Sequence, residues 1–260
     1  MQTEQTHHYG ANFHLLNNTF LQSMLTELCL NQTTQPQINR LIEKLYAGLV
    51  EHAANTVLKK ETKNFQTRMS ELHPEANLTT EVFAKSNKAV SVNLARAGTF
   101  PSHICYDLLH SILPAENIRQ DHIFAARMTN NSQQVTGTHL GSYKIGGGIE
   151  QASIFFPDPM GATGGTLTSA IDYYEKQIEG RAKAYVALHL IVTPEYLKKV
   201  LAHKAPVHVF ALRVDRGLSP ANVLQSPLGL YWDQEKGLND KQYIVPGAGG
   251  LGELLNNSYV

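Results

Sequence analysis

Apolar residues recur every three to four positions in the first third of the chain. The stretches Thr19 to Leu30 and Gln37 to Leu58 both carry such a stripe and predict amphipathic helices. Lys59 to Thr80 is polar and is interrupted by Pro74, which predicts a loop or a partly helical excursion. We therefore expect residues 1–80 to form a mainly helical segment.

The pattern changes at Lys88, after which short apolar runs of strand length alternate with helical stretches. Strands are predicted over residues 89–94, 122–126, 151–156, 183–192 and 207–214, and helices over residues 102–112, 167–178 and 194–201. This alternation predicts an α/β core over residues 88–216, with a parallel sheet that binds ligands at the carboxyl ends of its strands. Pro157 cannot donate to a strand ladder, so the strand before it is expected to stop one residue early.

Composition narrows the class of protein. The chain has 260 residues, a hydrophobic fraction of 42% and a formal net charge of zero. These values are typical of a soluble globular protein, and they give no global field that would attract nucleic acid or an acidic membrane. The polar stretch from Met1 to His8 lacks the apolar core of a signal peptide, and no run is long enough to span a bilayer. With only Cys29 and Cys105 as cysteines, the chain fits a reducing compartment, and a cytoplasmic location is expected.

The 12 histidines show no spacing typical of metal ligands, so no metal site built from protein side chains is predicted. His189 falls inside a strand-like run, where a core histidine with satisfied hydrogen bonds is expected.

The stretch from Asp158 to Thr166 carries the clearest chemical signal. It joins a predicted strand to a predicted helix through a loop of small residues that includes Gly164 and Gly165. The start of a helix offers unpaired N–H groups and the positive end of the dipole, which suit a phosphate, and glycines let the backbone approach the anion. An aspartate at the end of a strand suits sugar hydroxyls or a metal ion. The combination predicts a phosphoribosyl site.

Three motifs together resemble the uracil phosphoribosyltransferases. The Asp158 loop is similar to the family sequence D-P-M-L-A-T-G-G-S, with Gly161 and Thr166 as the two differences. Leu94 to Gly98 resembles the family loop L-R-A-G that contacts pyrophosphate, and Tyr243 to Gly249 resembles the segment Y-I-V-P-G-L-G that receives uracil. The motifs occur in the family order, and the resemblance covers most of residues 15–257.

The resemblance implies a fold and a reaction. The fold is a single type I phosphoribosyltransferase domain over residues 1–260, an α/β structure with a parallel sheet flanked by helices, a helical N-terminal segment, and an insert and hood over residues 217–260. The reaction is transfer of a phosphoribosyl group from phosphoribosyl diphosphate to uracil, giving UMP and pyrophosphate in pyrimidine salvage. The implied cofactor is Mg²⁺, bound mainly through the diphosphate, and the implied assembly is a homodimer or larger.

The resemblance also implies roles for individual residues. Arg96, Arg127 and Asp158 are the candidate catalytic residues, since the two arginines would stabilise the leaving pyrophosphate and Asp158 the ribose. Uracil and ribose are expected at Tyr243, Ile244, Gly249, Gly250 and Leu251. Besides the three catalytic residues, the residues expected to bind phosphoribosyl diphosphate are Pro159, Met160, Gly161, Ala162, Thr163, Gly164, Gly165 and Thr166.

The base-binding segment departs from the family pattern. The family continues G-D-A-G-D, whereas this chain has Gly250 in place of the first aspartate and Glu253 in place of the second. Residues 217–241, which contain Trp232, form an insert that would cover the base site, extend a dimer contact or decorate the surface. Two alternatives therefore stay open: an enzyme that acts on another base, and a catalytically weak regulator that binds a nucleotide or phosphoribosyl diphosphate.

Overall fold

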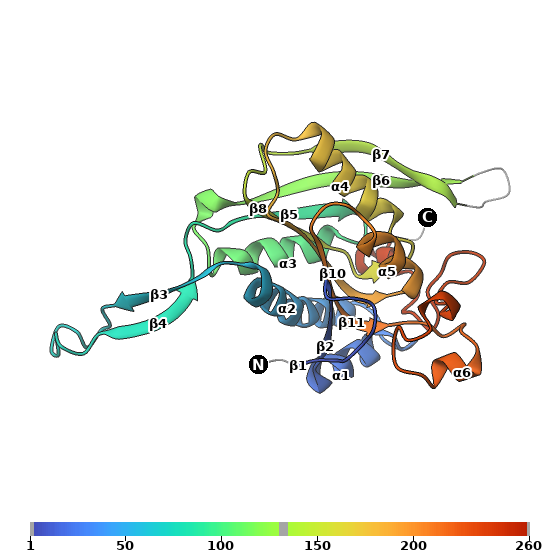
Figure 1. Cartoon of the computed structure of the whole chain (residues 1–260), viewed down its shortest axis with the longest axis horizontal. Helices are drawn as coiled ribbons and strands as arrows, with labels where there is room; N and C mark the ends of the chain where they lie inside the picture. The colour runs from blue at the N-terminus through green and yellow to red at the C-terminus, as the bar shows by residue number, and fades with distance from the viewer. Residues whose placement is uncertain (1–2, 130–134, 259–260) are drawn as a thin grey trace.

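The computed structural model describes residues 3–129 and 135–258, and for Thr3 and residues 125–129 and 135–140 it describes the backbone alone. Within these ranges a nine-stranded sheet runs in the order β1-β2-β11-β10-β8-β5-β6-β7, with β9 beside β10 (Figure 1). The strands are β1 (Thr3–Glu4), β2 (Phe13–Asn17), β5 (Lys88–Ala95), β6 (Ile118–Thr129), β7 (Val135–Lys144), β8 (Ala152–Pro157), β9 (Met160–Gly161), β10 (Ala184–Val192) and β11 (Val207–Val214). The pairs from β2 to β6 along this order are parallel, and the two outermost pairs are antiparallel. The α/β class and the mostly parallel sheet predicted from the sequence are confirmed.

Helices cover both faces of the sheet. One face carries α1 (Thr19–Leu28), α2 (Gln37–Val57) and α3 (Thr99–His110), and the other carries α4 (Gly165–Gln177) and α5 (Pro194–Leu201) (Figure 1). Each of these helices was predicted from apolar spacing, within a few residues at its ends. No helix among the described residues has the length and apolar character needed to cross a membrane.

Strand β10 lies at the centre of this arrangement, and all nine of its residues are buried. Leu188 and Leu190 face the core shared with α2, whereas Tyr185 and Ala187 face the core shared with α5. Burial on both faces explains why β10 reads as an unbroken apolar run instead of an alternating one.

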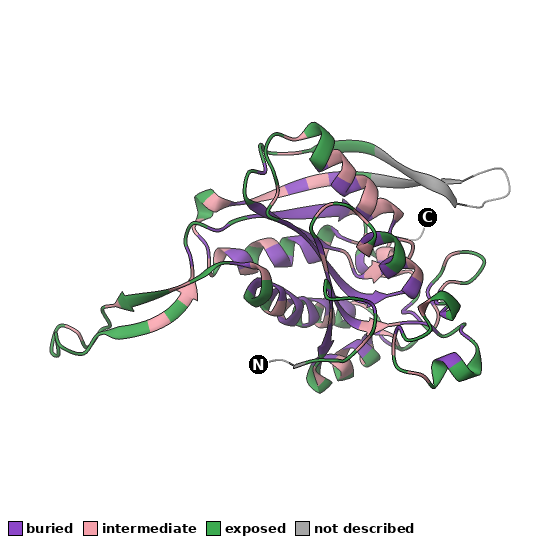
Figure 2. Cartoon of the chain, viewed as in Figure 1, coloured by how far each residue is buried: buried purple, intermediate pink, exposed green. Residues whose placement is uncertain are grey.

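The first 80 residues contain strands that the sequence did not predict. β2 adds to the main sheet beside β11, and its Phe13 and Leu15 are buried. β3 (Lys60–Phe65) and β4 (Leu78–Phe83) form a separate antiparallel hairpin that projects from the body of the molecule (Figure 1). The prediction of a loop or a helical excursion over residues 59–80 is therefore wrong. Most side chains of the hairpin are exposed (Figure 2), so neither face carries the apolar alternation by which a strand is recognised.

The prediction that the strand before Asp158 would stop early is also wrong, because β8 includes Pro157 opposite Leu188 of β10. Successive residues of a strand direct their N–H groups to opposite neighbours. Asp158 donates to Leu188 on β10, so the missing N–H of Pro157 would have pointed toward β5. The recorded pairing with β5 ends at Phe155, so proline removes no ladder bond there.

The C-terminal insert packs against the start of the chain. The Tyr9 hydroxyl donates to Glu235 at 2.5 Å, and the buried Glu235 also pairs with Arg216. Trp232 donates from its indole N–H to the Pro194 carbonyl at 3.0 Å and packs edge-on against the Tyr9 ring. Trp232 is thus a packing residue, and this part of the insert joins the N-terminal segment to α5.

A buried charge ties the sheet to α4. Asp121 on β6 is fully buried and accepts hydrogen bonds from Arg119 Nε at 3.0 Å, Gly146 N at 2.9 Å and Tyr174 Oη at 2.8 Å. Burial raises the pKa of Tyr174 far above its usual value, so its hydroxyl stays protonated and donates. Arg119 also donates to the next two carbonyls of the glycine turn, which is therefore held in place.

Replacing Asp121 is expected to destabilise the fold strongly. Asp121→Ala leaves the partly buried Arg119 without its carboxylate, and loss of one partner of a buried pair costs roughly 3–5 kcal/mol. Urea unfolding followed by circular dichroism measures this change. The matched control is Glu81→Ala, which removes the exposed pair with Lys60 at 3.9 Å and should change stability by less than about 1 kcal/mol. Equal effects of the two substitutions would contradict the structural role of Asp121.

Candidate functional site

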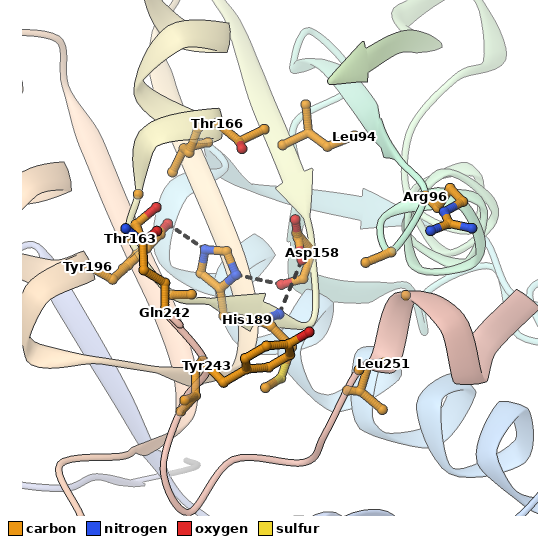
Figure 3. A pocket seen from close by; sticks show the side chains of 18 of the residues that line it. Leu94, Arg96, Asp158, Thr163, Thr166, His189, Tyr196, Gln242, Tyr243 and Leu251 are labelled. Carbon is orange, nitrogen blue, oxygen red and sulfur yellow. Dashed lines mark hydrogen bonds between the residues drawn. The ribbon is translucent and has the colours of Figure 1, made fainter. Parts of the chain in front are cut away.

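A cavity of about 380 Å³ opens at the carboxyl ends of β5, β8 and β10 (Figure 3). These strands are adjacent in the sheet, so the loops that follow them meet at one edge. Parts of all three sequence motifs line this cavity, from residues 94–97, 158–166 and 243–250. Its volume lies in the range of small-molecule sites.

The loop after β8 brings Asp158 and the start of α4 to the cavity. Asp158 follows the strand directly, and its Oδ1 accepts the Met160 N–H at 3.1 Å. Gly164 precedes the helix with a φ of 75°, and a Cβ there would also lie 2.8 Å from Val200 Cγ2, so a glycine is required. Because Gly164 and Thr166 border the cavity, the N-terminal end of α4 faces it, as an anion site needs.

The loop after β5 carries Arg96. Gly98 permits this loop to pack against the Asp158 loop, since a Cβ there would lie 2.8 Å from Leu94 O and 3.0 Å from Pro157 O. Arg96 Nη2 lies 3.7 Å from Glu253 Oε1, and the Arg96 side chain is 43% exposed. Such exposed pairs contribute at most about 1 kcal/mol. Little free energy therefore holds Arg96 away from an incoming diphosphate.

The C-terminal segment covers the cavity from the side opposite α4. Buried Asp215, at the end of β11, accepts the Gly247 N–H at 2.7 Å and Arg213 Nε at 2.6 Å, while Arg213 Nη2 donates to the Gly247 carbonyl at 3.2 Å. Both main-chain groups of Gly247 are thus held by one ion pair. The short helix α7 (Leu251–Asn256) then brings Glu253 to the cavity.

Most of the residues predicted to form the site do line the cavity. These are Arg96, Asp158, Met160, Ala162, Thr163, Gly164, Thr166, Tyr243, Ile244, Gly249, Gly250 and Leu251. Pro159, Gly161 and Gly165 belong to the same loop without bordering the described cavity. Arg127 lies on β6 opposite Thr138, and its side chain falls outside the described residues.

Sequence reasoning did not assign several side chains to the site that line the cavity, among them His189, Tyr196, Gln242 and Glu253. His189 is buried, with Nδ1 2.5 Å from the Asp158 carbonyl and Nε2 2.5 Å from Tyr196 Oη, so the predicted satisfied core histidine is confirmed. Alternation along β10 predicts which face His189 points to, but it does not reveal that this end of the strand borders a cavity. Gln242 has a positive φ of 61° in the turn before Tyr243, a local feature with no clear sequence signal.

The site also bears on metal binding. Residues 3–129 and 135–258 contain no group of three or more histidine, cysteine or acidic side chains that could hold a metal ion. Two carboxylates, Asp158 and Glu253, border the cavity and offer the oxygen ligands that Mg²⁺ prefers. The donor set therefore fits a magnesium ion that takes most of its ligands from a bound diphosphate and water.

Comparison with known proteins agrees with this geometry. A family model described as uracil phosphoribosyltransferase matches residues 15–234. The chain is 26% identical over 245 residues to the uracil phosphoribosyltransferase of Latilactobacillus sakei, covering 94% of this chain and 98% of the relative, and 27% identical over 243 residues to that of Streptococcus mutans, covering 94% and 97%. The solved structure of the AQ2163 protein from Aquifex aeolicus shares the fold, with a TM-score of 0.69 at 21% identity over 94% of this chain and 97% of that one.

Fold and site together define an enzyme of the phosphoribosyltransferase class, a glycosyltransferase that acts on small molecules. The chain belongs to the uracil phosphoribosyltransferase family.

The buried histidine beneath Asp158 makes stability depend on pH. Burial lowers the pKa of His189 from 6.5 to about 4, so the folded protein holds it neutral while the unfolded chain binds a proton below pH 6.5. This contribution to stability is complete above pH 6.5 and is lost as the pH falls toward 4, by about 1.4 kcal/mol per pH unit. Urea unfolding at pH 7, 6 and 5 should show a steeper loss for the unmodified protein than for His189→Asn. Equal slopes would contradict a neutral, buried His189.

Proposed function

We propose that the protein transfers a phosphoribosyl group from phosphoribosyl diphosphate to uracil, giving UMP and pyrophosphate in pyrimidine salvage. One observation carries the proposal: the phosphate-type loop at Asp158 and the Tyr243–Gly249 segment line the same cavity from opposite sides. A donor sugar and an acceptor base would therefore meet between them. A cytoplasmic location stays a prediction from the sequence composition, and a homodimer or larger assembly stays a prediction from the family resemblance.

The residues around the cavity suit the charges that develop during transfer. As the bond from C1 of the ribose to the pyrophosphate breaks, the leaving group gains negative charge and the sugar becomes cationic. Arg96 on the β5 loop would stabilise the leaving pyrophosphate, and the Asp158 carboxylate would bind ribose hydroxyls and offset the positive charge of the sugar. The N–H groups at the start of α4 would hold the 5′-phosphate. Binding both substrates in one cavity also supplies the orientation that a two-substrate reaction needs.

A magnesium ion would add electrostatic stabilisation of the leaving diphosphate. Asp158 and Glu253 are the carboxylates of the cavity that would face it. The sequence resemblance implies that the diphosphate itself holds most of the ion.

Recognition of the base is assigned to main-chain groups of the C-terminal segment. Gly249 has a φ of 71°, and Gly247 one of 65° with no space for a Cβ beside the Ile244 carbonyl. Glycine therefore fixes a backbone path that other residues do not follow. The Arg213–Asp215 pair stabilises this path where it turns, which favours a preformed site for a small planar ligand.

Glu253 supports the uracil assignment despite the missing family aspartate. A Cβ on residue 250 would lie 2.5 Å from Glu253 Oε2, so the glutamate carboxylate occupies the space beside Gly250. Gly250 itself has a φ of −84°, which any residue adopts, so its backbone alone does not require glycine. We infer that Glu253 supplies the carboxylate that the family carries on the preceding turn.

A second candidate function is transfer to a base other than uracil. The feature that favours it is Gly250, which stands where the family carries an aspartate in the base-binding segment. The two candidates share the phosphoribosyl half of the site and differ only in the acceptor.

The direct test incubates the protein with Mg²⁺, phosphoribosyl diphosphate and each nucleobase in turn, with nucleotide formation followed by chromatography. UMP is expected as the product. Asp158→Asn keeps the acceptor for the Met160 N–H but loses the charge, so kcat/KM should fall roughly 10- to 100-fold with little change in the melting temperature. A different nucleotide as the main product would show that its base, and not uracil, is the acceptor. Unchanged turnover by Asp158→Asn would contradict the role of Asp158.

The role of Glu253 has its own test. Glu253→Ala should lower kcat/KM for the base roughly 10-fold, since it removes a charged hydrogen-bonding group from the cavity. Gly250→Asp in the Glu253→Ala background should recover much of the loss, because the new carboxylate then has the space that Glu253 occupied. The matched control is Asp240→Asn, an exposed acid on the same segment, which should leave the rate unchanged. If kcat/KM of the double variant does not exceed that of Glu253→Ala, the inference that Glu253 supplies the missing carboxylate is contradicted.

A further inference from the structure

A pair of buried rings lies directly beneath the Asp158 loop. His189 comes from β10 and Tyr196 from α5, and both are at least 97% buried while bordering the floor of the cavity (Figure 3). We propose that His189 and Tyr196 are positioning residues that fix residues 158–164 in the conformation that binds phosphoribosyl diphosphate. This inference rests on the proposed function for the sugar-phosphate half of the site, and it does not depend on which base is the acceptor.

Hydrogen bonding fixes both rings in a single direction. The Asp158 carbonyl can only accept, so His189 Nδ1 carries the hydrogen and donates to it at 2.5 Å. The neutral ring then leaves Nε2 as an acceptor, and the Tyr196 hydroxyl, 2.5 Å away, donates to it. The chain of bonds runs from Tyr196 through His189 to the main chain of Asp158 (Figure 3). Rotation of the His189 ring or displacement of the Tyr196 hydroxyl would therefore break a buried hydrogen bond.

The Tyr196 ring also sets the space beneath the loop. A Cβ on Gly161 would lie 3.2 Å from Tyr196 Cδ2 and 2.9 Å from Val192 Cγ1, and a Cβ on Gly164 would lie 3.5 Å from the same ring atom. The contact with Val192 requires a shift, and the contact with the Tyr196 ring is tighter than side chains normally make. Gly161 is one of the two positions at which the loop departs from the family motif, which has a leucine there. A side chain at this position would press on Val192 and on the Tyr196 ring together.

The first turn of α5 holds the same loop through its backbone. Thr193, which caps this helix, donates from its N–H to the Gly161 carbonyl at 3.0 Å and from its hydroxyl to the Ala162 carbonyl at 2.7 Å. The same hydroxyl oxygen accepts the Tyr196 N–H at 3.0 Å. The Asp158 loop is therefore joined at Asp158, Gly161 and Ala162 to one unit formed by the end of β10 and the start of α5. Movement of Tyr196 would be transmitted to the phosphate-binding end of the loop.

Loss of the Tyr196 hydroxyl should weaken binding of the sugar diphosphate. Tyr196→Phe keeps the ring and leaves His189 Nε2 without its donor, and we expect the Kd of phosphoribosyl diphosphate, measured by calorimetry with Mg²⁺ on the full chain, to rise about five-fold. The matched control is Tyr185→Phe, which removes a hydroxyl bonded to Glu175 at 2.6 Å at the other end of β10. Both variants should lose stability, and only Tyr196→Phe should lose affinity. Equal affinity in the two variants would overturn the inference.

A second set of variants tests the packing beneath Gly161 without measuring turnover. Gly161→Leu alone should collide with Val192 and the Tyr196 ring and lower both the melting temperature and the affinity for phosphoribosyl diphosphate. Gly161→Leu combined with Val192→Ala relieves the tightest contact and keeps the Tyr196 hydroxyl, so the double variant should bind more tightly than Gly161→Leu. Additive losses in the double variant would show that the two positions do not share one space and would overturn the packing argument.

The outcomes separate this inference from the proposed function. An unmodified protein that binds phosphoribosyl diphosphate and makes no UMP contradicts the uracil assignment and leaves the positioning role of His189 and Tyr196 intact. An unmodified protein that does not bind phosphoribosyl diphosphate at all contradicts both.

Discussion

The site depends on the close approach of two loops at the carboxyl edge of the sheet. β5 and β8 are neighbours in the sheet, and the loops that leave them touch where Gly98 lies against the Pro157 carbonyl. A side chain at Gly98 would push the two loops apart, and with them Arg96 and Asp158. The loop after β8 is also fixed by the pairing of β8 with β10 and by the hydrogen bond from Thr193, at the start of α5, to Gly161. Arrangement of charge in the cavity is thus a consequence of backbone packing between parallel strands.

The two halves of the cavity are built differently. The phosphoribosyl half is formed by loops at the ends of the central strands and by the start of α4. Its Asp158 loop is hydrogen-bonded to β10 and to the residue that caps α5. The base half is a C-terminal segment that crosses over the cavity and is held at Gly247 by Arg213 and Asp215 and at Val245 by main-chain hydrogen bonds with Gly217 and Gly237. The family match ends at residue 234, before this segment begins. The departures from the family pattern at Gly250 and Glu253 both lie in this half of the cavity.

Sequence reasoning predicted the buried parts of this molecule better than the exposed parts. The strands β5, β8, β10 and β11 read as short apolar runs and the helices on both faces carry apolar periodicity, because each packs against a core. The β3–β4 hairpin was missed because its side chains face solvent on both sides, so its strands are defined by pairing with each other and not by burial. Likewise, the motifs predicted which loops meet at the cavity. His189 and Tyr196 were missed because their position follows from the register of β10 and α5 beneath the loop, which no local pattern records.

In the proposed reaction, one cavity holds the phosphate, the ribose and the base. A crystal structure of the protein with UMP tests this most directly. We predict the 5′-phosphate at the N–H groups of residues 162–166, the ribose hydroxyls at Asp158, and the base against the main chain of Tyr243 to Gly249. A nucleotide bound elsewhere, or bound in this cavity with its base at the start of α4, would contradict the account.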